Sequence, residues 1–386
     1  MPSIYVFRDD VVKMGATFAL ALSTGWLFFQ AGMPAPYLMG SLFGVWFGGA
    51  MLRPIQPYLG VARWFHIPVI LGLAVMIGAA FDQQMLVQIT IWWKSLCVMM
   101  ITTFIVCMTG YQLLTRWRGY DKRLAFFCSL PGGQAEAMIL ARQMVEKDYV
   151  VALFHLVRVT VVFLSTPLLL AFIQGGDAVA ASNRTLASMP SIFDLPLYAL
   201  GLFIFIAVLG LGLALILRLP LPYLLGPMCL SILFHLMGWA DLPRINEFVI
   251  LAQLAIGGAI GARLAKVPFQ EVFGYLKDAF ITTVLILSLF FIAAIIMAMT
   301  EAFNFLELWL AFVPGGLYEV TLLALIFGFD VAFVAFHHTV RIIPLIFAMS
   351  FIGKRLPDTK EGPDTKEGPD TKEGPDTKEE PVTKET

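Results

Sequence analysis

The chain has 386 residues, of which 59% are hydrophobic and 14% are charged, and its formal net charge is −1. Soluble domains average roughly 45–50% apolar and about 25% charged residues, so this composition excludes an ordinary soluble protein. We therefore expect the lipid bilayer to be its main partner, and we expect no nucleic-acid partner.

Long apolar runs, almost free of charge, follow one another along the chain. A bilayer core about 30 Å thick needs roughly 20 apolar helical residues to cross it, and each segment in lipid must pair its own backbone groups. The first run follows Arg8 and Lys13 and lacks a convincing small-residue cleavage site, which favours a retained anchor over a signal peptide. The sequence thus predicts an all-α integral membrane protein with about ten transmembrane helices. The clearest runs are residues 14–29, 69–81, 95–114, 149–173, 197–217 and 279–299.

Several blocks of sequence recur in the same order about 183 residues later. Ordered recurrence at a nearly constant offset indicates an internal duplication. We expect one repeat at residues 1–173 and a second at 196–355, joined by an external linker at 174–195. The matched blocks are Met33–Gly40 with Leu219–Gly226, Val69–Leu71 with Val249–Leu251, and Pro131-Gly132-Gly133 with Pro314-Gly315-Gly316, followed in register by Glu136, His155 and Arg158 with Glu319, His338 and Arg341.

Residues 356–386 differ from the rest of the chain. From Pro357 they repeat the hexad PDTKEG with drift, and they carry five lysines against four aspartates and six glutamates. Because this segment has almost no apolar side chain, it cannot bury a core, and we predict a disordered cytoplasmic tail.

The lysines and arginines indicate how the two halves lie in the membrane, because these residues concentrate in cytoplasmic loops. If each half has five full crossings plus a re-entrant Pro-Gly-Gly segment and the N-terminus is inside, only Lys94, Arg184 and Arg244 among the basic loop residues lie outside. Letting the Pro-Gly-Gly segments cross fully separates the charges less well. With an odd number of crossings per half, the second repeat is inverted relative to the first and both termini are cytoplasmic.

Pro131-Gly132-Gly133 and Pro314-Gly315-Gly316 each lie near the middle of an apolar stretch that is otherwise compatible with a helix. Proline cannot donate to the helix ladder and clashes with the preceding turn, while glycine tolerates positive φ. We expect each helix to break there and to leave the N-terminus of a second half-helix at membrane depth, where it can bind an anion or a dipole. A paired kink used only for packing is the alternative.

Glu136 and Glu319 lie three residues after the second glycine of each motif. A carboxylate at that position completes the cap of a helix N-terminus. A carboxylate inside a membrane protein is also suited to exchanging protons or binding a cation. Both interpretations, a cap and a coupling site, stay open.

Arg158 and Arg341 lie inside predicted spans, three residues after His155 and His338. The i, i+3 spacing puts each pair on one helix face. A charge within a membrane span is costly and faces a partner or a watery path, and the two glutamates are the expected partners. A structural ion pair and a role in substrate binding or gating both stay open.

Other chemistry finds little support. The chain has no Walker-type phosphate loop, which argues against an ATP-driven pump. Its histidines and cysteines show no metal-site spacing. We therefore predict no metal, no cofactor and no enzymatic activity.

The residues around the two motifs resemble the AbrB-type membrane protein family over about residues 14–355. The resemblance implies a bacterial inner-membrane protein that arose by internal duplication and is regarded as a transporter. Some members carry an ammonia monooxygenase label, and one branch is associated with regulation of gene expression. The chain departs from the family where His155 and His338 replace a frequent glutamine. The residues that carry the resemblance are Ser129–Gly133, Asp148–Arg158, Pro314–Thr321, and Gly328-Phe329-Asp330 before Arg341, with Glu146-Lys147-Asp148 as the divergent first-half counterpart.

The leading prediction is a secondary transporter of a small polar or anionic solute, coupled to protons or Na⁺. The alternative is a membrane-embedded regulator of gene expression, and an ammonia monooxygenase-like enzyme is less favoured. The sequence names neither the solute nor the oligomeric state, and a homo-oligomer stays open. The expected substrate-binding residues are Pro131, Gly132, Gly133, Arg158, Pro314, Gly315, Gly316 and Arg341, and the expected coupling residues are Glu136, Glu319, His155, His338 and Asp330.

Overall fold

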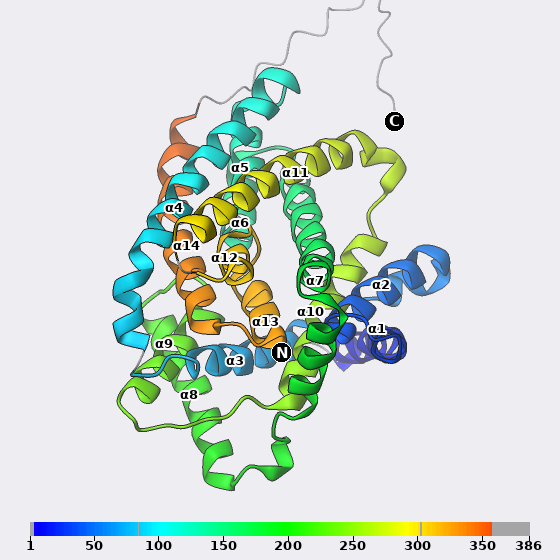
Figure 1. The fold of residues 1–386 in the computed structure, drawn as a ribbon. Coiled ribbons are helices and arrows are strands. Elements are labelled where there is room, and N and C mark those ends of the chain that lie inside the picture. Colours follow the sequence, from blue (N-terminus) through cyan, green and yellow to red (C-terminus); the bar gives the residue numbers. More distant parts are fainter. Residues whose placement is uncertain (1–3, 84, 302, 357–386) are drawn as a thin grey trace, which may run out of the picture.

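Every regular element is a helix in the part of the chain that the computed structural model describes, which is residues 4–83, 85–301 and 303–356 (Figure 1). The all-α class expected from composition is confirmed. The expected tail falls outside the described residues from position 357 onward. The longer helices are α1 Ile4–Gln30, α2 Pro36–Met51, α3 Arg63–Gly78, α4 Met85–Gln112, α5 Lys122–Ser129, α6 Gln134–Met144, α7 Asp148–Ala187, α8 Leu197–Ile216, α9 Pro222–Leu236, α10 Asn246–Ala265, α11 Phe269–Thr300, α12 Phe305–Phe312, α13 Leu317–Phe327 and α14 Val331–Arg355.

Seven helices in the described residues are long and apolar enough to cross a membrane, namely α1, α4, α7, α8, α10, α11 and α14. The helices α3 and α9 are also apolar but have only 16 and 15 residues. At 1.5 Å per residue they reach about 24 Å, less than a bilayer core of about 30 Å. The structure therefore supports a multi-pass membrane protein, and a total of about ten crossings stays a prediction.

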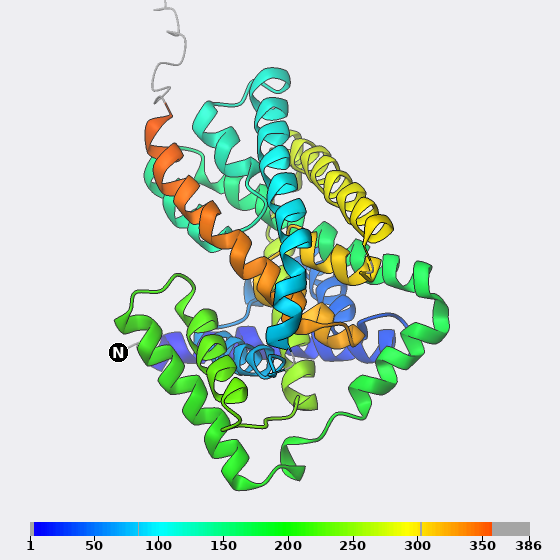
Figure 2. The same cartoon turned by 60° about the vertical axis from the view of Figure 1, so that its left-hand side comes forward.

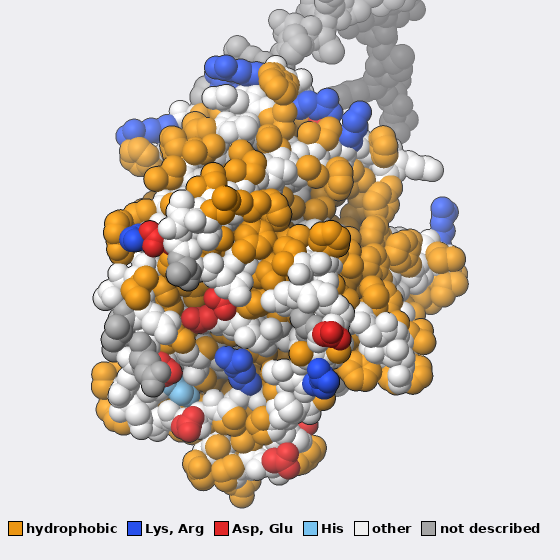
Figure 3. Space-filling view, in the orientation of Figure 1, with side chains coloured by type: hydrophobic (Ala, Val, Ile, Leu, Met, Phe, Trp, Pro, Cys, Tyr) orange, Lys and Arg blue, Asp and Glu red, His pale blue; other side chains and the backbone are white. Residues whose placement is uncertain are grey.

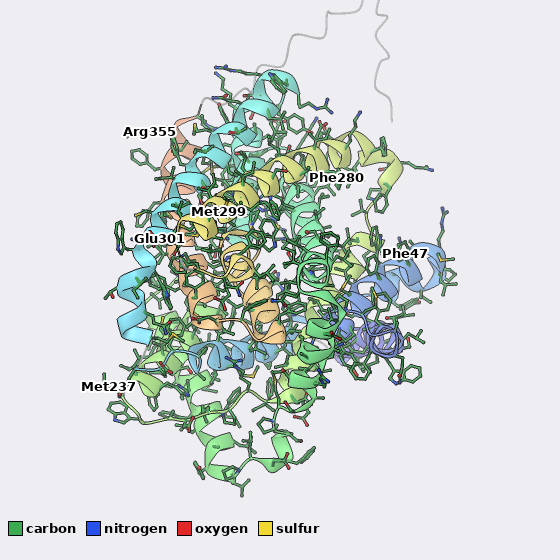
Figure 4. The ribbon with its side chains drawn as sticks, in the orientation of Figure 1. Phe47, Met237, Phe280, Met299, Glu301 and Arg355 are labelled. Carbon is green, nitrogen blue, oxygen red and sulfur yellow. The ribbon has the colours of Figure 1, made fainter. Side chains whose placement is uncertain are left out.

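The outer surface of the helices is apolar, as a lipid-facing protein requires. Orange side chains cover much of the face shown in Figure 3, and Phe47, Phe280 and Met299, labelled in Figure 4, are among the exposed apolar residues. Their exposure ranges from 49% for Phe47 to 82% for Met299. In water such a surface would drive aggregation, whereas lipid tails can cover it.

The helices pack in two groups that draw on both halves of the sequence (Figures 1 and 2). In the first group α1 packs on α2 and α8 on α9, and the halves are joined by contacts of α2 with α10 and of α3 with α9. Glycines permit the closest crossing, since an added Cβ at Gly257 or Gly261 of α10 would lie 2.6 Å from a backbone oxygen of α2. The second group contains α4–α7 and α11–α14, with α7 packed on α11 and α14 on α4.

The segment expected to be an external linker, residues 174–195, is largely helical. The helix α7 is interrupted at Gly175, where φ is 81° and ψ is 173°, and a second helical stretch then runs to Ala187. Glycine adopts this positive φ at no steric cost, so the chain changes direction at a kink between the two stretches. A short 3₁₀ turn, Ile192–Asp194, follows and is capped by Ser191.

Candidate functional site

Two helical hairpins lie at the centre of the second group of helices. In the first hairpin α5 ends at Ser129 and α6 begins at Gln134, and in the second α12 ends at Phe312 and α13 begins at Leu317. The connecting residues are the two Pro-Gly-Gly motifs, and all but Gly316 among these six residues are buried. Each hairpin therefore presents the C-terminus of one short helix and the N-terminus of the next at a buried turn.

The glycines of the two turns serve different physical needs. Gly133 precedes α6 in a left-handed conformation, with φ 61°, and Gly132 has φ 149°. Gly316 precedes α13 with an ordinary φ of −71°, but the carboxylate of Glu319 occupies the place where its Cβ would stand. The first turn thus uses glycine for its backbone, and the second uses it for the space that it leaves.

Each turn packs against the long helix that follows the other hairpin. A Cβ at Gly132 would lie 3.9 Å from Nε of Arg341 on α14, and one at Gly315 would lie 3.8 Å from Cγ1 of Val162 on α7. The structure thereby brings together motifs that are separated by about 183 residues in the sequence.

The two buried arginines hold the turns through backbone carbonyls. Arg158 of α7 donates to the carbonyl oxygens of Cys128, at 2.7 Å, and Leu130. Arg341 of α14 donates to those of Phe312, at 2.7 Å, and Val313, at 3.0 Å. The last carbonyls of a helix lack intrahelical partners and carry partial negative charge, so a guanidinium stabilises them. The arginines are 2% and 1% exposed.

This arrangement corrects one expectation from the sequence. Within the described residues no ion pair joins Arg158 or Arg341 to Glu136 or Glu319. The guanidinium groups bind the C-terminal ends of α5 and α12, whereas the carboxylates belong to the N-terminal ends of α6 and α13. The arginines lie at helix C-termini, which carry partial negative charge, and the glutamates lie at helix N-termini, which carry partial positive charge. The two kinds of side chain are therefore kept apart.

A centre of positive charge results between the hairpins. Arg158 and Arg341 are close enough to repel each other, and the Nε atom of each is buried without a hydrogen-bond partner. Arg341 also donates to Nδ1 of His338 at 2.8 Å, and Nε2 of the same ring bonds to the carbonyl oxygen of Leu310 at 2.9 Å. His155 is equally buried, one turn before Arg158 on α7.

Asp330 lies away from this centre. Its Oδ1 accepts from the backbone N–H of Phe333 at 2.9 Å and so caps the N-terminus of α14. Burial raises the pKa of Asp330 above its ordinary value of 3.8, partly offset by hydrogen bonds from the start of the helix and by Arg244. Its expected coupling role stays a prediction, while its capping role is visible.

A small cavity of about 20 Å³ lies where the hairpins meet α3, α7 and α10. The carboxylate of Glu319 lines it, is 6% exposed, and has an Oε2 atom without a hydrogen-bond partner. Such a volume holds about one water molecule. The remaining lining residues are His66, Gln134, Leu156, Val159, Ile256, Ala259, Ile260, Arg263 and Tyr318.

Four polar residues of this cavity were not expected from the sequence. Gln134 and Tyr318 follow the Pro-Gly-Gly motifs by one and two residues, so their position in the repeat was a usable signal. His66 lies on α3 and Arg263 on α10, each near the end of an apolar run. From sequence alone, polar residues at such positions are usually assigned to loops. Only the packing of these helices against the hairpins reveals their proximity.

Comparison with known proteins agrees with the resemblance found in the sequence. A family model described as "Transition state regulatory protein AbrB" matches residues 42–356. A curated relative, "Uncharacterized protein YhjN" of Bacillus subtilis (strain 168), is 25% identical over 344 residues, which cover 85% of this chain and 89% of the relative. The family match covers well over half of the chain.

Proposed function

The chain belongs to the AbrB family, and from that membership and the geometry of its hairpins we propose that it is a secondary transporter of a small polar or anionic solute, coupled to protons or Na⁺. The proposal places it in the bacterial inner membrane with both termini in the cytoplasm. Its two inverted repeats, residues 1–173 and 196–355, each contribute one hairpin to the site. A homo-oligomer is compatible with this arrangement.

The observation that carries the proposal is the meeting of two interrupted helices around a cavity bordered by a buried carboxylate. Transporters with inverted repeats bind solutes near the membrane midplane, at the N-termini of discontinuous helices. Irregular backbone at such depth is tolerated where it is buried in protein or lines a cavity. The first condition describes the Pro-Gly-Gly turns, in which five of the six residues are buried.

The charges favour an anionic or polar solute. The N-termini of α6 and α13 carry partial positive charge, and Arg158 and Arg341 add two buried cations nearby. Although these arginines bind carbonyl groups, each retains a buried Nε–H without a partner. We assign solute binding to the turns and the arginines, and coupling to the glutamates.

The size of the cavity implies movement during transport. A volume of about 20 Å³ admits a water molecule but no organic solute. The described conformation is therefore a closed one under this proposal, and the hairpins have to separate from α3 and α10 to admit solute. Rigid-body displacement of one bundle against the other is the usual solution in such folds.

Uptake by proteoliposomes tests the proposal. The full chain is reconstituted with imposed pH or Na⁺ gradients and challenged with a panel of radiolabelled small carboxylates, inorganic anions and amines. At least one compound should accumulate above empty vesicles, and both Glu319→Gln and Arg341→Gln should abolish that uptake. Glu271→Gln and Arg184→Gln, which alter exposed residues, serve as matched controls.

A membrane-embedded regulator of gene expression is the second candidate, because the matching family model is described as a regulatory protein. An experiment in cells distinguishes regulation from transport. If a regulatory phenotype of a deletion strain is restored equally by wild type, Glu319→Gln and Arg341→Gln, and no compound is taken up, regulation without transport is the better assignment.

A further inference from the structure

The two motif glutamates occupy equivalent places in the sequence but different places in the structure. Both stand at the third position of a half-helix. The carboxylate of Glu319 folds over Gly316 and lines the cavity, whereas a Cβ at Gly133 would lie 3.8 Å from Oε2 of Glu136. Glu136 is only partly buried and does not line the cavity. Any ion held in the cavity therefore meets one glutamate and not the other.

Two residues that line the cavity have a buried polar atom without a hydrogen-bond partner, namely Oε2 of Glu319 and Nδ1 of His66. Buried polar atoms are almost always hydrogen-bonded, so two such atoms on residues around a water-sized space suit a small ligand that can bond to both. A water molecule or a hydrated proton fits both the volume and the hydrogen-bonding groups.

The lining disfavours a metal cation. Hard cations such as Ca²⁺ take about six to eight oxygen ligands, and alkali ions also need a shell of oxygens. Only Gln134, Tyr318 and Glu319 offer side-chain oxygen atoms here. The guanidinium of Arg263 and the imidazole of His66 complete the polar lining, and the first of these repels any cation. A proton needs only one oxygen atom.

The residues that line the cavity with Glu319 extend to the surface of the protein. Arg263 lines the cavity with an exposed side chain, so it marks the rim. His66, which also lines the cavity, is half-buried, and its ring lies edge-on to that of Tyr318 at a centroid distance of 6.4 Å. The charged or titratable groups near Glu319 are thus Tyr318 beside it, His66 on α3, Arg263 on α10, and Glu136, which acts on Tyr318 from α6.

We infer that the coupling ion of the proposed transport is a proton, that it is held on Oε2 of Glu319 and not on Glu136, and that it enters through the cavity between His66 and Arg263. One O–H bond of a hydrated proton (H₃O⁺) in the cavity breaks as the O–H bond on the carboxylate forms, which leaves a water molecule, and solvent at the rim supplies the next proton to that water. The inference rests on the proposed function for its role in coupling, but the proton site itself does not.

Infrared difference spectroscopy tests the site without any transported solute. The purified full chain in detergent is titrated, and the carbonyl stretch of protonated carboxyl groups is followed with pH. One band should disappear in Glu319→Gln and persist in Glu136→Gln. Tyr318→Phe keeps the ring and removes the hydroxyl beside the carboxylate, so it should shift the same band. That variant keeps the test decisive if Glu319→Gln does not fold.

Three outcomes overturn the inference: a full set of bands in Glu319→Gln, loss of the same band in Glu136→Gln, or displacement of the proton band by NaCl but not by choline chloride at fixed pH. The last result would assign the site to Na⁺. If the band behaves as expected but no compound is taken up by proteoliposomes, the proton site stands and the transport proposal fails. The two failures are therefore distinguishable.

Discussion

The carboxylate of Glu319 folds back over the Cα atom of Gly316, so that a side chain at position 316 would occupy the same space as its Oε2 atom. The orientation of Glu319 toward the cavity therefore depends on a neighbour that has no side chain. The first hairpin lacks this dependence, because Gly133 is required there by its positive φ.

We expect Gly316→Ala to displace Glu319 and to destabilise the protein by about 1–3 kcal/mol through overpacking. Thermal unfolding in detergent measures this loss. The double variant Gly316→Ala/Glu319→Ala should recover most of it, because the clashing carboxylate is gone. Gly274→Ala, at a helical position with nothing within 4 Å of the added Cβ, should be neutral or slightly stabilising.

The matched pair in the first hairpin should behave differently. Gly133→Ala places a side chain on left-handed backbone, which costs roughly 1–2 kcal/mol whatever surrounds it. Removing Glu136 in the double variant Gly133→Ala/Glu136→Ala should restore nothing. Equal rescue in both hairpins would contradict the distinction drawn between their glycines.

Sequence patterns predicted where the helices begin and end better than they predicted which groups the buried side chains contact. Apolar runs and the prolines of the two motifs placed the interruptions between α5 and α6 and between α12 and α13, because helix-breaking chemistry is local. The partners of the two buried arginines are distant in the sequence and could not be predicted in this way. The sequence suggested the two motif glutamates, but the arginines bind backbone carbonyl groups at the C-terminal ends of α5 and α12, which carry partial negative charge.

The cavity shows a second limit of sequence reasoning. His66 and Arg263 lie in different halves of the chain and meet the hairpins only because α3 and α10 pack against α13. The pattern of apolar residues within a single helix does not predict that α3 and α10 pack against α13. The sequence also did not reveal that residues 174–195 are largely helical, because the kink at Gly175 is followed by a second helical stretch and glycine permits either a helix end or a kink.

The forked hydrogen bonds of Arg341 should be sensitive to a change that keeps its charge. Arg341→Lys retains a cation but cannot reach the carbonyl groups of both Phe312 and Val313 while also bonding His338. We expect a loss of about 1–3 kcal/mol in the free energy of unfolding, from one buried acceptor left unpaired. Denaturant unfolding measures it, with the exposed Arg184→Lys as control. An unchanged midpoint in Arg341→Lys would show that the carbonyl contacts are dispensable.

Asp330 should make stability depend on pH. Because burial raises its pKa in the folded protein, the folded state holds this proton at pH values where the unfolded chain has released it. The free energy of unfolding contributed by Asp330 is therefore present below the ordinary pKa of 3.8 and is lost as pH rises through the folded-state pKa. Asp330→Asn should remove that slope while keeping the helix cap, since asparagine also accepts from the N–H of Phe333. A pH series of melting temperatures gives the result. An unaltered slope in the variant would assign it to other groups.

The inverted arrangement of the repeats that we propose predicts that the open ends of the two hairpins face opposite sides of the membrane. Lys122 lies at the start of α5, beside the first open end, and Thr300 ends α11, just before the second; both are exposed. In a background without the native cysteines, a membrane-impermeant maleimide added to intact cells should label Thr300→Cys but not Lys122→Cys. Ser188→Cys, after α7, should behave like Thr300→Cys.

Permeabilised cells should give labelling at all three positions, which controls for reactivity. If Lys122→Cys and Thr300→Cys react from the same side, the hairpins enter from one face, and an odd number of crossings per half is excluded. A shared face would remove the architectural argument for transport while leaving the buried contacts of both turns intact.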